Sequence, residues 1–163
     1  MFNKIAAIVV FYHPPKEVIN NILTYSKDIS NVIVIDNSEE GVDKNKGYVD
    51  QLMKKNPDRS FHYHSMGENK GLAEAFNFGL ELADLLGCDW CFTMDSDSSF
   101  QNDIVSVYQN AERKYADSKV IAYAPQYDYD RIILRKSNRV ETTIWSMTSG
   151  TMFHIKKTIE AGG

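Results

Sequence analysis

Two carboxylates one residue apart, Asp95 and Asp97, directly follow an apolar run at 91–94. An apolar run that ends abruptly on polar residues is typical of a buried parallel strand, whose carboxyl end lies at the edge where open α/β sheets bind ligands. The two carboxylates can share one divalent cation, and their hard oxygen ligands favour Mg²⁺ or Mn²⁺ beside substrate phosphates. The alternative is that both are turn or capping residues before a helix expected from Phe100.

Two earlier apolar runs also end on clusters that could bind a ligand. The first is followed by Phe11, Tyr12 and His13, and the second by Asp36, Asn37 and Ser38. The Asp36 carboxylate suits an acceptor for the N–H of a nucleobase or for a ribose hydroxyl. The alternative for Asp36 is an Asx turn formed with the two residues that follow it.

A further polar group opens the longest periodic segment. Asn69 and Lys70 precede Gly71 at the expected start of this helix, where Lys70 either meets a base carbonyl or a phosphate or is simply solvated. Asn77 and Gly79 are unusual inside a helix because both residue types weaken it. Gly79 would allow close packing on the sheet, and Asn77 either reaches toward the ligand crevice or only packs.

A regular alternation of strands and helices must position these residues. Apolar runs predict strands at 5–11, 31–35, 60–64, 89–94 and 120–125, and helical periodicity predicts helices at 16–26, 47–55, 72–86 and 100–115. Extended segments at 128–136 and 139–147 suggest an antiparallel pair. This order predicts a three-layer α/β/α fold with a mainly parallel, doubly wound sheet and antiparallel strands toward the C-terminus.

The composition narrows the class of protein. The chain has 163 residues, 43% of them hydrophobic, and its net charge of −4 argues against a nucleic-acid partner. The run at 5–11 is too short to span a bilayer and lacks a signal-peptide pattern. Cys88 and Cys91 are expected to be buried thiols on opposite faces of one strand, because no second Cys or His pair completes a zinc set. We expect a cytoplasmic protein.

Three common ligand motifs are missing or incomplete. The first strand is not followed by Gly-x-Gly-x-x-Gly, and no Gly-x-x-x-x-Gly-Lys-Ser/Thr occurs, so neither a dinucleotide fold nor a P-loop is supported. A calcium loop beginning at Asp95 fails because Phe100 stands where glycine is needed and Ser106 where glutamate is needed.

The chain resembles the family 2 glycosyltransferases, which use nucleotide-sugar donors and have the A-type fold (GT-A). The resemblance rests on five segments in the same order and spacing: IVVFY at 8–12, VIDNS at 34–38, NKGLAEAFNFG at 69–79, TMDSDS at 93–98 and TSGTM at 148–152. It is closest to the rhamnosyltransferase-like branch and runs over essentially the whole chain.

The resemblance implies a role for each matching position. Asp36 would hold a pyrimidine base with help from Phe11, Tyr12, Asn37 and either Asn69 or Lys70. Asp95 and Asp97 would bind the ribose and, through Mg²⁺ or Mn²⁺, the diphosphate. The sugar or acceptor side would be lined by Asn77, Ser149, Gly150 and Thr151. The implied reaction is inverting, metal-assisted transfer of a sugar from a dTDP- or UDP-sugar to a glycan or lipid-linked acceptor, and the rhamnosyltransferase-like branch implies rhamnose as that sugar.

The family's general base normally lies in an acidic motif downstream of the Ser-Gly segment, and no such motif precedes Gly163. Glu141 and Asp130 are acids on the expected side, but neither matches. We therefore expect a fragment that forms a single GT-A-like domain. Residues 1–124 would be its nucleotide-binding half, and residues 125–163 the truncated start of the acceptor half. The surface on which the missing part would dock favours a homo-oligomer of this piece. For the longer enzyme, peripheral attachment to the inner face of the membrane is a further expectation.

Two other functions are compatible with parts of the pattern. A phosphatase that forms an aspartyl phosphate also has Asp-x-Asp after an apolar strand, with Asp95 as nucleophile and Asp97 as acid. That motif usually follows the first strand, whereas three strand–helix units precede it here. A non-catalytic nucleotide-binding module is the other alternative.

Overall fold

Six strands form one sheet in the computed structural model, which describes residues 4–29, 31–100, 103–115, 119–125 and 147–163. The strands are β1 (Ile5–Phe11), β2 (Asn31–Asp36), β3 (Ser60–Ser65), β4 (Trp90–Asp95), β5 (Ala122–Tyr123) and β6 (Met152–His154). Their spatial order is β3-β2-β1-β4-β6-β5. The first four are parallel, and β6 runs antiparallel to both β4 and β5.

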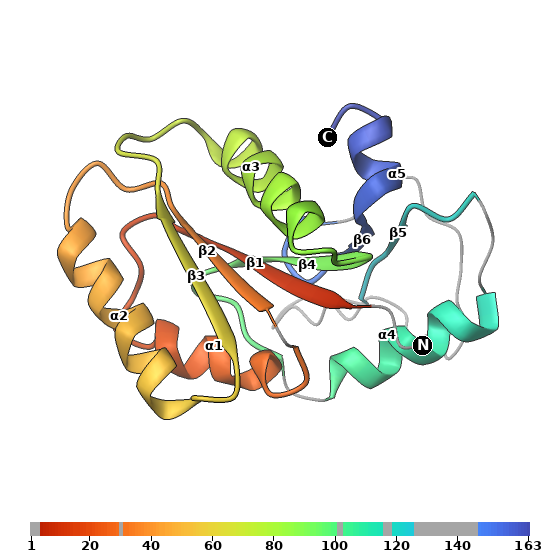
Figure 1. Ribbon diagram of the computed structural model, residues 1–163, viewed down its shortest axis with the longest axis horizontal. Helices are drawn as coiled ribbons and strands as arrows, with labels where there is room; N and C mark the ends of the chain where they lie inside the picture. Colours follow the sequence, from red (N-terminus) through yellow and green to blue (C-terminus); the bar gives the residue numbers. More distant parts are fainter. Residues whose placement is uncertain (1–3, 30, 101–102, 116–118, 126–146) are drawn as a thin grey trace, which may run out of the picture.

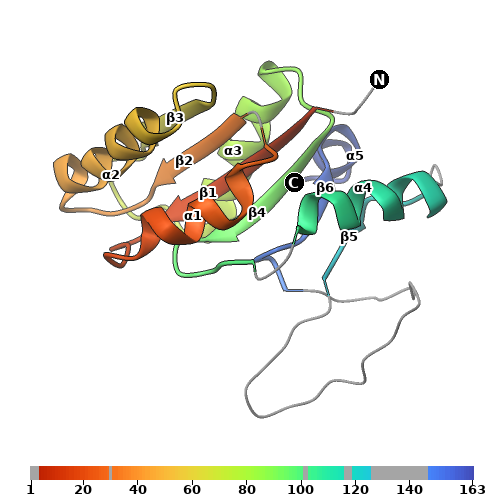
Figure 2. The ribbon, with the colours of Figure 1, turned by 90° about the horizontal axis from the view of Figure 1, so that it is seen from below.

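Helices cover both faces of this sheet (Figures 1 and 2). The helices α1 (Val18–Ser26), α2 (Val42–Lys55) and α4 (Ile104–Tyr115) lie on one face, and α3 (Leu72–Leu85) and α5 (Ile155–Glu160) lie on the other. The predicted fold class, a three-layer α/β/α arrangement with a mainly parallel sheet, is confirmed.

The central strand β1 explains why these layers form. All seven of its residues are buried, and alternate ones belong to two separate cores. Val9 and Phe11 face the core shared with α1, α2 and α4, whereas Ile8 and Val10 face the core shared with α3. A parallel strand that is covered on both faces is expected to be apolar at every position. The run at 5–11 has this pattern, and it is covered by helices on both faces.

Gly79 sets how closely α3 approaches the sheet. A Cβ atom added at this position would overlap the Ile8 side chain of β1. The predicted close helix–sheet packing at Gly79 is therefore confirmed.

Several predicted boundaries differ from the structure. The helix predicted at 47–55 begins earlier, at Val42, because Gly41 turns the chain with a φ of 78° and tertiary contacts bury Asn45. The helix predicted from Phe100 begins at Ile104, since Phe100 packs against the core instead. The strand predicted at 120–125 is reduced to β5, and the sequence did not predict β6 or α5. The segment 128–136 and all but the last residue of 139–147 lie outside the described residues.

The two cysteines are buried free thiols, as predicted, but they do not lie on opposite faces. Cys88 precedes β4, so strand alternation does not apply to it, and it shares the α3-side core with Cys91. Burial raises the pKa of both thiols, which keeps them protonated and unreactive. None of the helices in the described part of the chain is long and apolar enough to cross a membrane.

Candidate functional site

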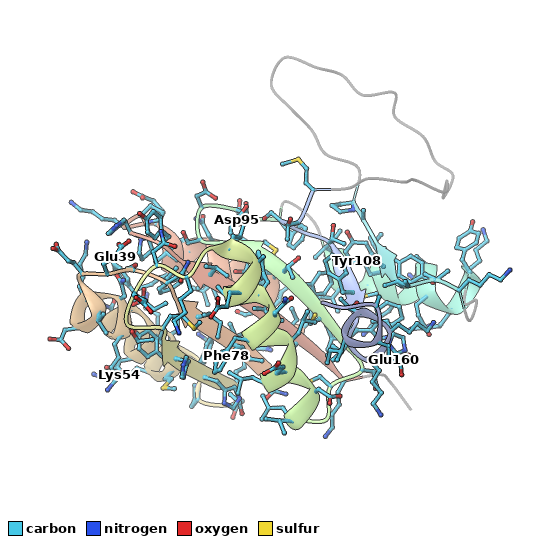
Figure 3. All side chains as sticks on the ribbon, turned by 90° about the horizontal axis from the view of Figure 1, so that it is seen from above. Glu39, Lys54, Phe78, Asp95, Tyr108 and Glu160 are labelled. Carbon is cyan, nitrogen blue, oxygen red and sulfur yellow. The ribbon has the colours of Figure 1, made fainter. Side chains whose placement is uncertain are left out.

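The carboxyl ends of β1, β2, β3 and β4 meet at one edge of the sheet. Phe11 pairs with Asp36, Asp36 pairs with Ser65, and Val10 pairs with Asp95. The clusters that follow β1, β2 and β4 are therefore neighbours, although 84 positions separate Phe11 from Asp95. In Figure 3, Asp95 and Glu39, which lies just beyond β2, point toward the same side of the molecule.

Asp36 is fully buried and forms a hub of internal hydrogen bonds. Tyr63 of β3 donates its hydroxyl to Oδ2 at 2.6 Å, and Asn45 of α2 donates its amide to both carboxylate oxygens at 3.0 and 3.2 Å. The backbone N–H of Ser38 donates to Oδ1 at 3.1 Å, which is the Asx turn considered as the alternative. A nucleotide would reach Asp36 only by displacing these donors. In the structure Asp36 therefore holds the surrounding residues together and is not accessible to a ligand.

Asn37 connects the end of β2 to the loop before α3. Its side-chain amide donates to Asn69 Oδ1 at 3.0 Å, and its side-chain oxygen accepts the backbone N–H of Lys70 at 2.9 Å. Asn69 Oδ1 also accepts the N–H of Gly71 at 3.0 Å. The predicted residues Asn37, Asn69 and Lys70 are thus brought together as one network at the sheet edge.

The amine of Lys70 is exposed and lies between two carboxylates. Its Nζ is 4.0 Å from Glu68 Oε1 and 3.8 Å from Glu74 Oε1. These exposed ion pairs contribute little to stability, so the amine can exchange them for a phosphate or base oxygen.

Phe11 and Tyr12 have opposite environments. Phe11 is fully buried in the core, whereas Tyr12 is 50% exposed, and its ring contacts that of His13 at 4.5 Å between centroids. His13 has a φ of 48°, which is rare for a residue with a side chain. Ser38 Oγ holds this conformation by accepting the backbone N–H of His13 at 3.1 Å. The accessible aromatic surface is therefore that of Tyr12 and His13, whereas Phe11 belongs to the core.

Asp95 and Asp97 lie at the turn after β4. Asp95 is partly buried and Asp97 is exposed. Burial, and then the charge of Asp97, raise the pKa of Asp95, while a hydrogen bond with Ser149 opposes this rise. Two carboxylates that repel each other at an open edge are a suitable place for a cation.

The segment containing Ser149, Gly150 and Thr151 runs beside this turn. Ser149 Oγ accepts the backbone N–H of Asp95 at 3.2 Å. The N–H of Gly150 and the carbonyl of Thr151 extend hydrogen bonding to Thr93 of β4. The Tyr108 hydroxyl from α4 donates to the Gly150 carbonyl at 2.8 Å. All three residues are buried, and Ser149 is the one whose side chain is hydrogen-bonded to Asp95.

Asn77 is exposed on α3 and lies beside the last residue of the chain. A Cβ atom added to Gly163 would be 2.8 Å from both side-chain polar atoms of Asn77. Asn77 thus lies near α5, and no hydrogen bond described in the structure joins it to the residues after β4. Glu141 and Asp130 lie outside the described residues.

Two residues of α1 that sequence reasoning did not single out reach the turn after β4. Asn21 donates its side-chain amide to the carbonyl of Ser96 at 3.1 Å. Thr24 Oγ1 accepts the N–H of Phe100 at 3.0 Å and donates to the Asn21 carbonyl at 2.6 Å. A weak sequence signal existed, because Asn21 and Thr24 are polar residues three positions apart within this helix, but it does not reveal their target.

The donor set at this turn fits Mg²⁺ or Mn²⁺ rather than zinc. Asp95 and Asp97 offer carboxylate oxygens, and Mg²⁺ is commonly bound by one or two carboxylates together with waters and phosphates. Within the part of the chain that the structure describes, no group of three or more His, Cys, Asp and Glu side chains could hold a metal. A cation here would therefore complete its coordination with ligand oxygens.

Solved structures share this fold. A mannosyltransferase from Pyrobaculum calidifontis, in complex with GDP-Man and Mn²⁺, superposes with a TM-score of 0.71 at 18% identity over 99% of this chain and 47% of its own. Residues 1–349 of S. aureus TarS give a TM-score of 0.66 at 12% identity, covering 97% of this chain and 49% of that one. A 4-diphosphocytidyl-2C-methyl-D-erythritol synthase from Anaerococcus prevotii gives 0.57 at 17% identity, covering 98% and 78%.

The chain thus spans about half the length of the first two of these proteins. No curated protein matches its sequence. At these identities the structural likeness establishes the fold alone. The family follows from the sequence itself, because residues 13–160 match the model of glycosyl transferase family 2. This chain belongs to glycosyl transferase family 2.

Proposed function

We propose that this chain is the donor-binding part of a glycosyltransferase that uses a nucleoside diphosphate sugar. The observation that carries the proposal is the register of β1, β2 and β4, which aligns Tyr12, Asn37 and Asp95 along one open edge. An exposed aromatic ring, amide groups and a carboxylate pair are the groups needed for a base, a ribose and a diphosphate.

The base would lie on the side of β1 and β2. Tyr12 offers an exposed ring for stacking. Asn69 and Lys70 are also exposed and offer an amide and an amine for the base edge, and the buried Asn37 holds both in place through its side-chain hydrogen bonds. We place Phe11 and Asp36 behind these residues because both are fully buried. In this proposal Asp36 fixes the loop that carries the base contacts and does not itself contact the base.

The ribose and diphosphate would lie at the end of β4. Asp95 and Asp97 would hold Mg²⁺ or Mn²⁺ together with the diphosphate oxygens, and Ser149 would support Asp95. When bound, the cation offsets the negative charge that develops as the nucleoside diphosphate departs. The mannosyltransferase that shares this fold is described in complex with GDP-Man and Mn²⁺, which supports a donor and a metal of this kind.

The remaining specificity is proposed from the family resemblance. The donor would be a dTDP- or UDP-sugar, rhamnose being one candidate, and the acceptor a glycan or lipid-linked precursor. Transfer would invert the anomeric centre, with a carboxylate outside the described residues as general base.

A thermal-shift panel tests donor binding. UDP, dTDP and GDP are each added with and without Mn²⁺. A nucleotide at 100 times its Kd stabilises the protein by about 2.7 kcal/mol, which corresponds to about 5–10 °C for a chain of this size. Asp97→Ala should abolish the Mn²⁺-dependent part of the shift. Asp50→Ala, which removes an exposed carboxylate of α2, is the matched control and should leave the shift unchanged.

Two outcomes would contradict the proposal. If no nucleotide shifts the melting temperature with or without Mn²⁺, this edge does not bind a donor. Hydrolysis of an aryl phosphate that is lost in Asp95→Asn would instead favour the phosphatase chemistry that the Asp-x-Asp pair also allows.

A further inference from the structure

The turn that carries Asp95 and Asp97 is attached to α1 at two points. The carbonyl of Ser96, the residue between the two aspartates, accepts the amide of Asn21 at 3.1 Å. The N–H of Phe100, where the turn ends, donates to Thr24 Oγ1 at 3.0 Å. These contacts join residues 75 and 76 positions apart in the sequence.

The two α1 side chains form a single unit. Thr24 donates its hydroxyl to the Asn21 carbonyl at 2.6 Å, so its oxygen is oriented to accept from Phe100. Both side chains are partly buried, which protects their hydrogen bonds from water. Asn and Thr are poor residues for the interior of a nine-residue helix, so the helix propensity of α1 does not favour them.

Other contacts hold the two ends of the same turn. Ser149 Oγ accepts the N–H of Asp95 at 3.2 Å, and the Phe100 ring packs edge-on against Tyr25 at 5.9 Å. Ser96 lies in the middle of the turn, between the two carboxylates. Among the hydrogen bonds of the described residues, the one that holds Ser96 from outside the turn comes from Asn21. Asp95 and Asp97 carry like charges one residue apart, so the two carboxylates would move apart if nothing held the turn.

We propose that Asn21 and Thr24 are positioning residues for the cation site, holding Asp95 and Asp97 at the spacing that one divalent cation needs. Neither residue touches the cation. They fix the backbone of the turn before the cation arrives, and this preorganisation lowers the ordering cost of binding. The inference rests on the proposed function, because it requires that the carboxylate pair bind a cation.

The test measures Mn²⁺ alone, through water-proton relaxation, so that no activity is required. Asn21→Ala should weaken Mn²⁺ binding about 10- to 100-fold, the range found when residues that orient metal ligands are removed. Asn20→Ala is the matched control, since it makes the same change at the adjacent, exposed position of the same helix. It should leave Mn²⁺ affinity unchanged.

Thr24 provides a second variant that separates positioning from folding. Thr24→Val keeps the shape but removes the oxygen, and should weaken Mn²⁺ binding in the same way. Thr24→Ser keeps the oxygen and should restore the affinity. Binding is compared only among variants whose circular dichroism spectra and metal-free melting temperatures match the wild type. A general structural role would lower the melting temperature without this rescue pattern.

The outcomes distinguish the two proposals. If the wild-type protein does not bind Mn²⁺, the proposed function fails at its cation site and this inference fails with it. If the wild type binds Mn²⁺, Asp97→Ala does not, and both Asn21→Ala and Thr24→Val bind as tightly as the wild type, only this inference is overturned. Loss of binding in Asn20→Ala as well would also overturn it, because the effect would then belong to the helix as a whole.

Discussion

At the scale of single residues, the two carboxylates at the centre of the sheet edge have different roles. Asp36 is fully buried and surrounded by donors, whereas Asp95 is partly buried and faces another carboxylate. A carboxylate with all its donors in place stabilises the native structure. A carboxylate that is held beside a like charge, as Asp95 is, lowers the stability of the protein and is available to bind a cation.

The first prediction concerns the donors around Asp36. Tyr63→Phe should destabilise the protein by about 1–3 kcal/mol, because it removes a 2.6 Å hydrogen bond from a buried carboxylate and leaves that oxygen with one donor fewer. Urea denaturation measures the loss. Tyr48→Phe, at a partly buried tyrosine of α2, serves as control and should stay within about 0.5 kcal/mol of the wild type. An equal effect of both variants would contradict the role assigned to Asp36.

The second prediction concerns the charge of Asp95. Because the pKa of Asp95 is raised in the folded protein, its stability contribution is greatest when Asp95 is protonated and is lost as the pH rises through this pKa. Asp95→Asn should therefore raise the melting temperature in EDTA at pH 7, and the gain should shrink toward pH 3. Added Mn²⁺ should stabilise the wild type but not this variant. A lower melting temperature for the variant at pH 7 would contradict the expectation.

At the scale of elements, the spacing between α3 and the sheet depends on Gly79. Helix propensity alone favours alanine over glycine by about 1 kcal/mol. At Gly79 the added methyl group would overlap Ile8, so the packing effect opposes the propensity effect.

The third prediction compares two helical glycines. Gly79→Ala should destabilise the protein by about 1–3 kcal/mol, the usual effect of overpacking a core. Gly47→Ala should stabilise it by about 0.5–1 kcal/mol, because nothing lies within 4 Å of the added Cβ in α2. Chemical denaturation of both variants measures the change in the free energy of unfolding, which should be a loss for Gly79→Ala and a gain for Gly47→Ala. A stabilising Gly79→Ala would mean that α3 moves away from β1 at little cost.

The same elements show what could be predicted from the sequence. The strands β1, β2 and β4 were predicted to within one residue at each end because they are buried on both faces and read as continuous apolar runs. The start of α2 was missed because the burial of Asn45 depends on Asp36, nine positions away on another element. The short strand β6 was missed because three residues carry too little periodicity to identify a strand.

The candidate site divides in the same way. The positions of Tyr12, Asn37 and Asp95 at one edge followed from strand order, because parallel strands end together. The burial of Asp36 and the contacts of Asn21 and Thr24 did not follow, because they depend on side-chain directions and on partners far away in the sequence.

At the scale of the whole molecule, the site is divided between two regions of the sheet edge. The proposed base contacts come from the ends of β1 and β2, and the proposed cation ligands come from the end of β4. A nucleoside diphosphate that spans both regions must couple them. A nucleoside without phosphates would occupy only the first.

The last prediction is that Mn²⁺ and UDP bind with positive coupling. Mn²⁺ should raise the affinity for UDP by the same factor by which UDP raises the affinity for Mn²⁺, since coupling between two ligands is reciprocal. Uridine should bind equally with and without Mn²⁺. Isothermal titration calorimetry measures each affinity, after correction for the complex that Mn²⁺ forms with UDP in solution.

Variants test whether the base and the cation bind at the two separate regions of the sheet edge. Tyr12→Ala should weaken the binding of UDP and uridine about 2- to 10-fold, which is the effect expected when an aromatic stacking contact is lost, and should leave the affinity for Mn²⁺ alone unchanged. Tyr115→Ala, at an exposed tyrosine of α4, is the control and should change neither affinity. If Mn²⁺ strengthened uridine binding as much as UDP binding, the coupling would not pass through the diphosphate, and the division of the edge into a base region and a cation region would be wrong.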